Sequence, residues 1–260
     1  MQVFEVFQNV DWDRMRLANM FGHKLNRHLR LLLNGRLFQE IREKKQFIRE
    51  DKILPVASLL SVTGKNIFPR ILEERAADGN VTSLELTAIA SLVAAYQPNA
   101  IFEIGTFDGR TTLNMAANAP AEAKITTLDL PKSKIYDTKL RIKSGDMKFI
   151  DKEKSGTRFH GTPYENRITQ ICADSAAYDF KTIENSFDFI FIDGSHSYSY
   201  VISDTENARK LLRNGKGVLL WHDYGWPEVV KALNDYYRND PWYSGLKNIE
   251  GTSLAVLVVK

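Results

Sequence analysis

From Pro98 to the last residue, short apolar segments alternate with segments of helical pattern, and no other feature limits the fold as strongly. AIFEIG, KITTLDL, RITQICAD, FDFIFIDG and GVLLWHDY are typical of buried strands, whereas RTTLNMAANA, SYVISDTENARKLLRNG and PEVVKALNDYYR are typical of helices. The run FDFIFIDG is almost wholly apolar, as expected for a strand that helices cover on both faces. With LKNIEG and TSLAVLVVK as a closing hairpin, the pattern predicts an α/β fold with a doubly wound, mostly parallel, seven-stranded sheet.

Two stretches fall outside this alternation. The polar residues 132–166 interrupt it between two predicted strands, and we interpret them as an insertion or lid over the sheet edge. Before the first strand, NVTSLELTAIASLVAAYQPNA predicts a helix that begins at Thr82 or Ser83 and stops before the next proline. We therefore expect a helical N-terminal extension or cap over residues 1–80 and the sheet domain over residues 81–260.

The N-terminal extension is basic over residues 14–52 and has the apolar spacing of two helices separated by Asn34-Gly35. We weigh three interpretations. We favour a solvated helical cap over the active site. The second interpretation is an oligomer interface or an acceptor-binding element, and the third is a surface that binds anionic lipid or nucleic acid. No aromatic ladder or RNA-binding motif accompanies the charge, so no nucleic-acid partner is expected. The apolar residues of the two predicted helices are Leu25, Leu29, Leu32, Leu33, Phe38, Ile41 and Ile48.

Composition is that of an ordinary globular protein. Of 260 residues, 43% are apolar and 26% are charged, and the net charge is only +3. The single cysteine, Cys172, cannot form an internal disulfide, which favours a reducing, cytoplasmic location. The N-terminus MQVFEVFQNVDWDRMR has acids where a signal peptide needs an apolar core, and the run LTAIASLVAAY is too short to span a bilayer. We therefore expect a cytoplasmic protein without a transmembrane segment.

The segment IFEIGTFDGR, residues 101–110, places acids beside glycines at the end of a predicted strand, where doubly wound sheets bind ligands. A nucleotide pyrophosphate needs three closely spaced glycines. This turn has the spacing Gly-x-x-x-Gly instead, and the charges of Glu103 and Asp108 would repel phosphate. A ligand with a positive charge and no phosphate fits better, and S-adenosylmethionine is such a ligand. Gly105 would let the backbone approach it closely.

Several motifs in order resemble one enzyme class. FEIGTFDGRTT resembles the first motif, Glu-x-Gly-x-x-x-Gly, of class I S-adenosylmethionine-dependent methyltransferases. An acid ends the next predicted strand, ITTLDL. The later segments FIDGSH and WHDY are similar to the small-molecule branch of that superfamily, which has Asp-Gly-x-His and His-Asp-Tyr at strand ends. The resemblance covers about residues 80–260 and implies a Rossmann-like fold.

The resemblance implies roles for the residues at the strand ends. The glycine turn would bind the methionine part of the cofactor, Asp129 would accept the ribose hydroxyls, Asp174 would face the adenine, and Asp193 would lie near the methyl-transfer centre. The alternative left open is that an acid after a strand only caps a helix or forms a turn, and Gly109 could be only a tight-turn residue. The predicted cofactor-binding residues are Glu103, Gly105, Thr106, Asp129, Leu130, Asp174, Ser175 and Asp193.

Methyl transfer from a sulfonium is an in-line displacement, so the enzyme mainly positions the acceptor and removes its proton. A histidine can take a hydroxyl proton, and a divalent metal can make the hydroxyl more acidic. We predict His222, His196 and Asp193 as catalytic residues, and Asp193, His222 and Asp223 as ligands of a divalent metal. Some related O-methyltransferases have an acid at the position of His222, so this departure puts magnesium in doubt and makes His222 a candidate base. The alternative is that both histidines are hydrogen-bonded structural residues.

Other side chains near these motifs have simpler interpretations. Asp204 could contact His196 from the following helix, although we favour a solvated position. Tyr224 and Trp226 could line an acceptor pocket. Trp221 is expected in the core. Cys172, inside a predicted apolar strand, is expected to be a buried small residue and not a nucleophile.

The sequence therefore predicts an S-adenosylmethionine-dependent methyltransferase that O-methylates a small molecule, such as a sugar or a secondary metabolite. An anionic or lipid-linked acceptor and a homo-oligomer stay open. The rival enzyme is a nicotinamide-dependent oxidoreductase, whose phosphate-binding glycine triplet is missing here. A non-catalytic binding protein that keeps the fold is the third alternative. The intact Glu103, Asp129 and Asp174 argue against a loss of cofactor binding.

Overall fold

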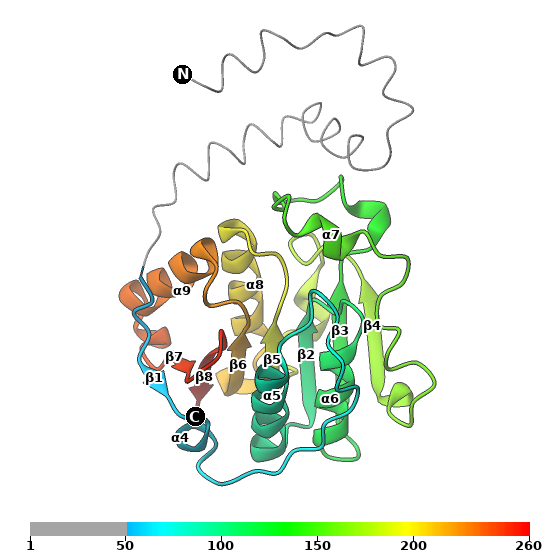
Figure 1. Cartoon of the computed structure of the whole chain (residues 1–260). Helices are drawn as coiled ribbons and strands as arrows, with labels where there is room; N and C mark the ends of the chain where they lie inside the picture. Colours follow the sequence, from blue (N-terminus) through cyan, green and yellow to red (C-terminus); the bar gives the residue numbers. More distant parts are fainter. Residues whose placement is uncertain (1–50) are drawn as a thin grey trace, which may run out of the picture. The chain divides into compact units, whose positions relative to one another are not determined.

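The computed structural model describes residues 51–260 (Figure 1), which lie within one compact unit of the chain, Arg49–Lys260. The helices expected from residue 14 to residue 48 lie outside the described residues, so they stay predictions. Within residues 51–80 the described helix is the short α4, Leu59–Thr63. The domain boundary expected near residue 80 also stays a prediction.

Eight strands form one sheet in the order β1-β7-β8-β6-β5-β2-β3-β4 (Figure 1). β8 runs antiparallel to β6 and β7, whereas the other neighbouring pairs are parallel. The predicted fold is confirmed, including all seven predicted strands. The additional strand, β1, has two residues, too few to leave a periodic signal in the sequence. The strands are Val56–Ala57 (β1), Ala100–Ile104 (β2), Lys124–Asp129 (β3), Ile168–Cys172 (β4), Phe189–Ile192 (β5), Gly217–Trp221 (β6), Lys247–Ile249 (β7) and Ala255–Val259 (β8).

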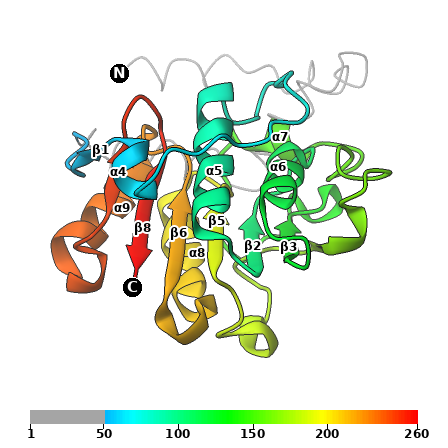
Figure 2. The same cartoon turned by 90° about the horizontal axis from the view of Figure 1, so that it is seen from below.

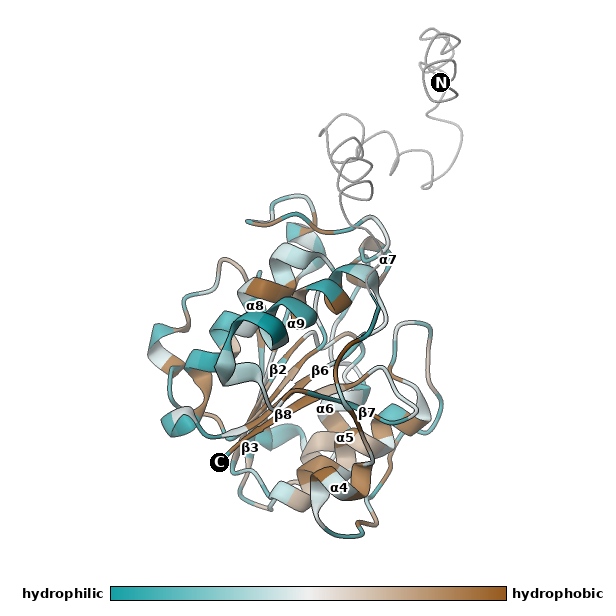
Figure 3. Ribbon diagram, turned by 90° about the vertical axis from the view of Figure 1, so that its left-hand side faces the viewer, coloured by the Kyte–Doolittle hydropathy of each residue, from teal (hydrophilic) through white to brown (hydrophobic). Residues whose placement is uncertain are grey.

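Helices cover both faces of the sheet, with α4, α5 and α6 on one face and α8 and α9 on the other (Figure 2). Strand β5 shows why its sequence is continuously apolar: Phe189 and Phe191 pack with α5 and α6, whereas Ile190 and Ile192 pack with α8 and α9. Figure 3 shows the hydrophobic colouring concentrated in the strands between the two helix layers. The remaining helices are Ser83–Tyr96 (α5), Arg110–Asn118 (α6), Met147–Ile150 (α7), Tyr198–Leu211 (α8) and Pro227–Asn239 (α9).

Two helices begin where the sequence indicates, one at a capping residue and one at a proline. The Thr82 hydroxyl accepts a hydrogen bond from the Glu85 backbone N–H (3.3 Å), and the Glu85 carboxylate accepts one from the Thr82 N–H (2.9 Å). This capping box fixes the start of α5 and the position of the Glu85 carboxylate. Pro227 is the first residue of α9, where a missing N–H leaves no helical hydrogen bond unmade.

The chain between β3 and β4 contains one short α-helix, α7, and two 3-10 turns in place of a long crossover helix. The part of this chain that follows α7 forms backbone hydrogen bonds with the glycine turn after β2. The N–H of Gly156 donates to the carbonyl of Phe107, and the N–H of Arg158 donates to that of Asp108, both at 2.9 Å. Figure 1 shows α7 above the carboxyl ends of β2 and β3. The insertion therefore lies beside the strand ends, and its function as a lid stays a prediction.

Some expectations about single features are corrected and others are confirmed. Cys172 is exposed, not buried, because it is the last residue of the edge strand β4. Asp204 is 1% exposed, not solvated, because it lies on the buried side of α8. Trp221 is in the core, where its indole N–H donates to the Thr205 hydroxyl (2.9 Å). Among residues 51–260, no helix is long and apolar enough to cross a membrane.

Candidate active site

The carboxyl ends of the parallel strands β2 to β6 line a cavity of about 280 Å³. The chain order of the strands reverses between β2 and β5, so the cavity lies at the switch point where doubly wound sheets bind ligands. We call the ends of β2, β3 and β4 its cofactor half and the ends of β5 and β6 its acceptor half. The predicted residues that line the cavity are Gly105, Thr106, Asp129, Leu130, Asp174, Ser175, Asp193, His196, His222 and Asp223.

Gly105 lies where the two halves meet. Its φ of +95° is in the left-handed region, and a Cβ built on it would lie 2.0 Å from the backbone oxygen of Asp193. No side chain fits there. Glycine is therefore needed both for the close approach of the β2 and β5 ends and for the left-handed backbone conformation. Gly109 has φ +86° and is the N-cap of α6, and a Cβ there would meet the Phe159 ring at 2.7 Å. It is therefore a tight-turn residue that also packs against the insertion.

Glu103 is not among the residues that line the cavity. Its side chain is fully buried and accepts hydrogen bonds from the hydroxyls of Thr112 and Thr127. The Thr127 hydroxyl in turn lies 2.5 Å from that of Thr106, which does line the cavity. Burial, opposed by the two threonine hydrogen bonds, raises the pKa of Glu103 to about 8. The structure places Glu103 behind the cavity wall, and its predicted role toward the cofactor stays a prediction.

The two acids of the cofactor half, Asp129 and Asp174, accept hydrogen bonds from different sets of donors. Asp129, at the end of β3, has its Oδ2 atom 2.7 Å from Lys152 Nζ and 2.5 Å from Ser155 Oγ. Asp174, after β4, accepts from the Tyr200 hydroxyl (2.8 Å) and from two backbone N–H groups. Both acids are almost buried and line the cavity. They are placed where hydroxyl and amine groups of a ligand could be recognised.

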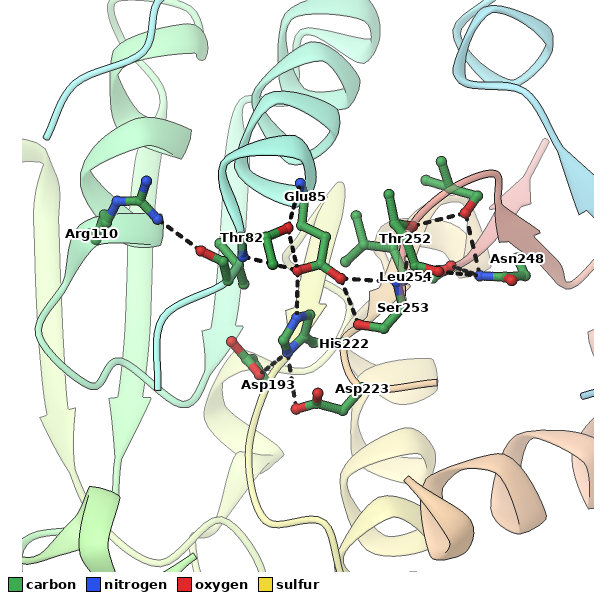
Figure 4. A network of polar contacts seen from close by, with 12 residues as sticks. Thr82, Glu85, Arg110, Asp193, His222, Asp223, Asn248, Thr252, Ser253 and Leu254 are labelled. Atoms are coloured by element: carbon green, nitrogen blue, oxygen red, sulfur yellow. Dashed lines mark hydrogen bonds and ion pairs between the residues drawn. The ribbon is translucent and has the colours of Figure 1, made fainter. Parts of the chain in front are cut away.

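His222 follows β6 and contacts three carboxylates (Figure 4). Its Nδ1 atom lies 3.0 Å from Asp193 Oδ1 and 3.0 Å from Asp223 Oδ2, and its Nε2 atom lies 3.2 Å from Glu85 Oε2. Burial alone would lower the pKa of His222, but the charge of Asp193 and hydrogen bonds to the three carboxylates raise it well above its ordinary value.

His196, in the loop between β5 and α8, is held at both ring nitrogens. Nδ1 lies 2.6 Å from Asp146 Oδ1 and Nε2 lies 2.5 Å from Asp223 Oδ2. The Trp226 indole stacks on the imidazole, with ring centroids 4.8 Å apart and planes at 25°. Burial would lower the pKa of His196, but the hydrogen bonds to the two aspartates raise it to about 10. Asp223, which contacts both histidines, has φ +60°, a strained backbone of the kind found at functional sites.

Asp193, His222 and Asp223 are also arranged as a set of metal ligands, because one donor atom from each lies within 4.8 Å of the others. Donors about 2.1 Å from one ion and at right angles lie about 3 Å apart, close to the distances from His222 Nδ1 to the two aspartates. One imidazole with two carboxylates suits manganese, iron or zinc, whereas magnesium prefers oxygen alone. The predicted ligands fit a divalent transition metal, and its binding stays a prediction.

Sequence reasoning missed two acids that contact the histidines of the acceptor half from other elements. Glu85 contacts His222 across a separation of 137 residues, and the signal it leaves, Thr-x-x-Glu, indicates only a helix cap. Burial would raise the pKa of Glu85, but hydrogen bonds from His222 and Ser253 hold it well below its ordinary value. Asp146 lies in the polar insertion, where no pattern distinguishes it from neighbouring acids. Their partners come from distant elements, which a single sequence does not reveal.

The two aromatic residues after β6 differ in position. Trp226 is 45% exposed and lines the cavity. Tyr224 is fully buried and is not among the lining residues. Its hydroxyl accepts from the backbone N–H groups of Ile53 (3.0 Å) and Leu54 (3.2 Å). Tyr224 is therefore a packing residue, which corrects its predicted place in an acceptor pocket.

Comparison with protein families indicates which class of enzyme has a domain of this kind. Residues 102–224, which include the glycine turn and the strand-end acids and histidines, match the model of a methyltransferase domain. This part of the chain is a class I S-adenosylmethionine-dependent methyltransferase domain. The match favours methyl transfer over the nicotinamide-dependent alternative, and S-adenosylmethionine is the cofactor of such domains.

Solved structures agree with the methyltransferase fold. The O-methyltransferase TomG from Streptomyces achromogenes, solved with S-adenosylmethionine, superposes with a TM-score of 0.53 at 15% identity, over 85% of this chain and 96% of its own. A methyltransferase from Podospora anserina, solved with S-adenosylhomocysteine, has a TM-score of 0.51 at 17% identity, over 70% of this chain and 81% of its own. At these identities the likeness shows the fold alone.

A relative in sequence is an uncharacterized protein of Acanthamoeba polyphaga mimivirus. It is 29% identical over 136 residues, 51% of this chain and 56% of the relative. The match thus spans little more than half of that protein.

Proposed function

We propose that the methyltransferase domain transfers the methyl group of S-adenosylmethionine to a hydroxyl of a small molecule. The observation that carries this proposal is the cluster of carboxylates and imidazoles in the acceptor half, directly beside the glycine turn. A cofactor on the glycine turn would present its methyl group to this cluster. Carboxylate-supported histidines are suited to removing a hydroxyl proton during the displacement.

The cofactor half would hold S-adenosylmethionine through three contacts. The backbone at Gly105 would lie against the methionine part, Asp129 would accept hydrogen bonds from the ribose hydroxyls, and Asp174 with Ser175 would face the adenine. The support for these roles is that the residues line one cavity in the order of the strands that carry them, β2, β3 and β4. Glu103 would act from behind the wall, through Thr127 and Thr106.

In the reaction, the acceptor oxygen attacks the methyl carbon, the carbon–sulfur bond breaks, and the sulfonium becomes the neutral thioether of S-adenosylhomocysteine. The hydroxyl proton passes to an imidazole. His196 suits this role when its ring is neutral and one ring nitrogen has exchanged its aspartate for the acceptor hydroxyl, because the aspartate that stays in place stabilises the cation that proton transfer forms. His222 is the alternative base, held by Glu85 and Asp193.

Asp193, His222 and Asp223 would hold a divalent metal, which when bound would make the acceptor hydroxyl more acidic. A small-molecule acceptor, such as a sugar or a secondary metabolite, is consistent with the likeness to TomG, an O-methyltransferase involved in tomaymycin synthesis. A cytoplasmic location, the absence of a nucleic-acid partner and a homo-oligomer stay parts of the proposal that rest on the sequence alone.

The proposal is tested with S-adenosylmethionine carrying an isotopically labelled methyl group and matched acceptors that offer a hydroxyl, an amine or a thiol on the same sugar or phenol ring. Label in a base-stable ether, with one S-adenosylhomocysteine released per methyl, is the expected result. Transfer to the amine or thiol only would contradict O-methylation. Cofactor binding without transfer to any acceptor would favour the non-catalytic alternative.

A further inference from the structure

We infer that α7 and its flanking residues couple the cofactor half of the cavity to His196. The inference rests on the proposed function, because it takes Asp129 as the partner of the cofactor ribose. Asp146 is the N-cap of the one-turn helix α7, and Lys152 follows the helix after one intervening residue. Asp146 contacts the acceptor half and Lys152 contacts the cofactor half, so this short element bridges the two.

On the acceptor side, Asp146 is 5% exposed and uses both carboxylate oxygens. Oδ2 accepts from the Ser195 hydroxyl (2.8 Å) and from the His196 backbone N–H (3.0 Å), and Oδ1 lies 2.6 Å from His196 Nδ1. The carboxylate therefore fixes both the loop after β5 and the orientation of the imidazole ring. Asp146 is a positioning residue, since it would act on the acceptor through His196.

On the cofactor side, the Lys152 ammonium lies 2.7 Å from Asp129 Oδ2 and donates to the carbonyl of Phe149, within α7, at 3.0 Å. Ser155 contacts the same Oδ2 atom. No described residue donates a hydrogen bond to Asp129 Oδ1, which is the oxygen left for the ribose hydroxyls. Lys152 also lines the cavity, where it is the one lysine or arginine among the described lining residues.

The helix itself is part of the cavity wall. Phe149 and Ile150 line the cavity, and the Phe149 ring packs edge-on against Phe107 of the glycine turn, with centroids 5.9 Å apart. α7 is a single helical turn, and the residues at its two ends are held by the contacts of Asp146 with His196 and of Lys152 with Asp129. A cofactor that hydrogen-bonds Asp129 and packs on α7 would therefore also fix Asp146 and His196. Such coupling is reciprocal, so an ordered His196 would favour cofactor binding in turn.

The cofactor-side contact is tested by calorimetric titration of the full chain with S-adenosylhomocysteine. Lys152→Met removes the ammonium that holds Asp129 Oδ2, so the carboxylate loses the orientation that presents Oδ1 to the ribose, and we expect an affinity about tenfold weaker than in the wild type. The matched control is Lys154→Met, which removes an exposed lysine two residues further on and should leave the affinity within about twofold. Equal affinities of the two variants would overturn the assignment of Lys152.

The coupling is tested through the fluorescence of Trp226, because this indole stacks on His196. Saturating S-adenosylhomocysteine should change the emission of the wild type, and the change should be absent from Trp226→Phe. It should also be lost in Asp146→Ala and Asp146→Asn while both still bind the ligand. Two variants are used because alanine could disturb folding, which the asparagine variant avoids. A change that persists in both, or no change in the wild type, would overturn the coupling.

The outcomes separate this inference from the proposed function. A wild type that binds no S-adenosylhomocysteine removes the proposed function, and the inference with it. A wild type that binds the ligand, with a Trp226 emission change that persists in both Asp146 variants, removes only the coupling through α7.

Discussion

The two halves of the cavity are built differently. In the cofactor half, Asp129 and Asp174 stand apart, and each accepts from amine, hydroxyl or backbone N–H donors. In the acceptor half, carboxylates and imidazoles contact one another in a continuous chain that runs from Glu85 through His222, Asp223 and His196 to Asp146. Separate acceptors suit the binding of a ligand with several donors. Interlocked acids and bases suit proton removal, and this difference predicts that the two functions can be damaged separately.

The largest expected effect comes from breaking the acceptor half. His222→Ala removes the imidazole that three carboxylates share, so turnover should fall about a thousandfold, the scale of a lost acid–base group. Cofactor affinity should stay within about twofold, since the cofactor half is untouched. The matched control is His160→Ala, an exposed histidine paired with Glu165 outside the cavity, which should keep full activity. Full activity of His222→Ala would show that His222 is neither the general base nor an essential metal ligand.

Breaking the junction between the halves should destabilise the fold. A Cβ on Gly105 would overlap the Asp193 backbone oxygen, so Gly105→Ala should cost about 3 kcal/mol in the free energy of unfolding, measured by urea titration. Gly64→Ala is the control: its φ is +71°, but nothing lies within 4 Å of the added Cβ. That variant should lose only about 1 kcal/mol, from backbone strain alone. Equal losses of unfolding free energy in the two variants would show that the close approach at Gly105 does not require glycine.

Breaking the cofactor half should change binding more than chemistry. Asp129→Asn removes the charge that would accept from the ribose, so the dissociation constant of S-adenosylhomocysteine should rise about thirtyfold, equivalent to about 2 kcal/mol. Turnover at saturating cofactor should change by less than about threefold. A loss of turnover with unchanged affinity would reverse the division between the halves.

The smallest expected effect is on the pH dependence of stability and comes from Asp204, which is buried in α8. Burial, with the charge of Asp174 and against a hydrogen bond from Ser175, raises the pKa of Asp204 to about 7. The folded state therefore keeps a proton that the unfolded chain loses near pH 4, so the free energy of unfolding falls as pH rises from about 4 to 7. Asp204→Asn cannot ionise, so the loss of stability between pH 5 and pH 8 should be smaller than in the wild type by about 1–2 kcal/mol. An unchanged slope in urea titrations would show that Asp204 ionises normally.

The sequence predicted the parts of the fold that leave local patterns. The apolar run of β5, the capping residue Thr82 and the proline that starts α9 each have a physical signature within a few residues. The two-residue strand β1 has none, and Cys172 was misplaced because an apolar strand pattern does not show that β4 is at the edge.

The same limit applies to the site. The predicted acids and histidines follow strands, and parallel strands bring their carboxyl ends to one edge, so sequence alone grouped them. Glu85 and Asp146 reach the histidines from a helix N-terminus and from the insertion. Their contacts depend on how those elements pack. The burial of Glu103 behind the cavity wall likewise follows from tertiary structure.

The central claim is that the cavity at the β2–β5 switch point binds the cofactor of methyl transfer. The most direct test is calorimetric titration of the purified full chain with S-adenosylhomocysteine, with NAD as the control ligand under the same conditions. The account predicts saturable binding of S-adenosylhomocysteine at one site per chain and no binding of NAD. Binding of NAD, or no binding of S-adenosylhomocysteine, would contradict it.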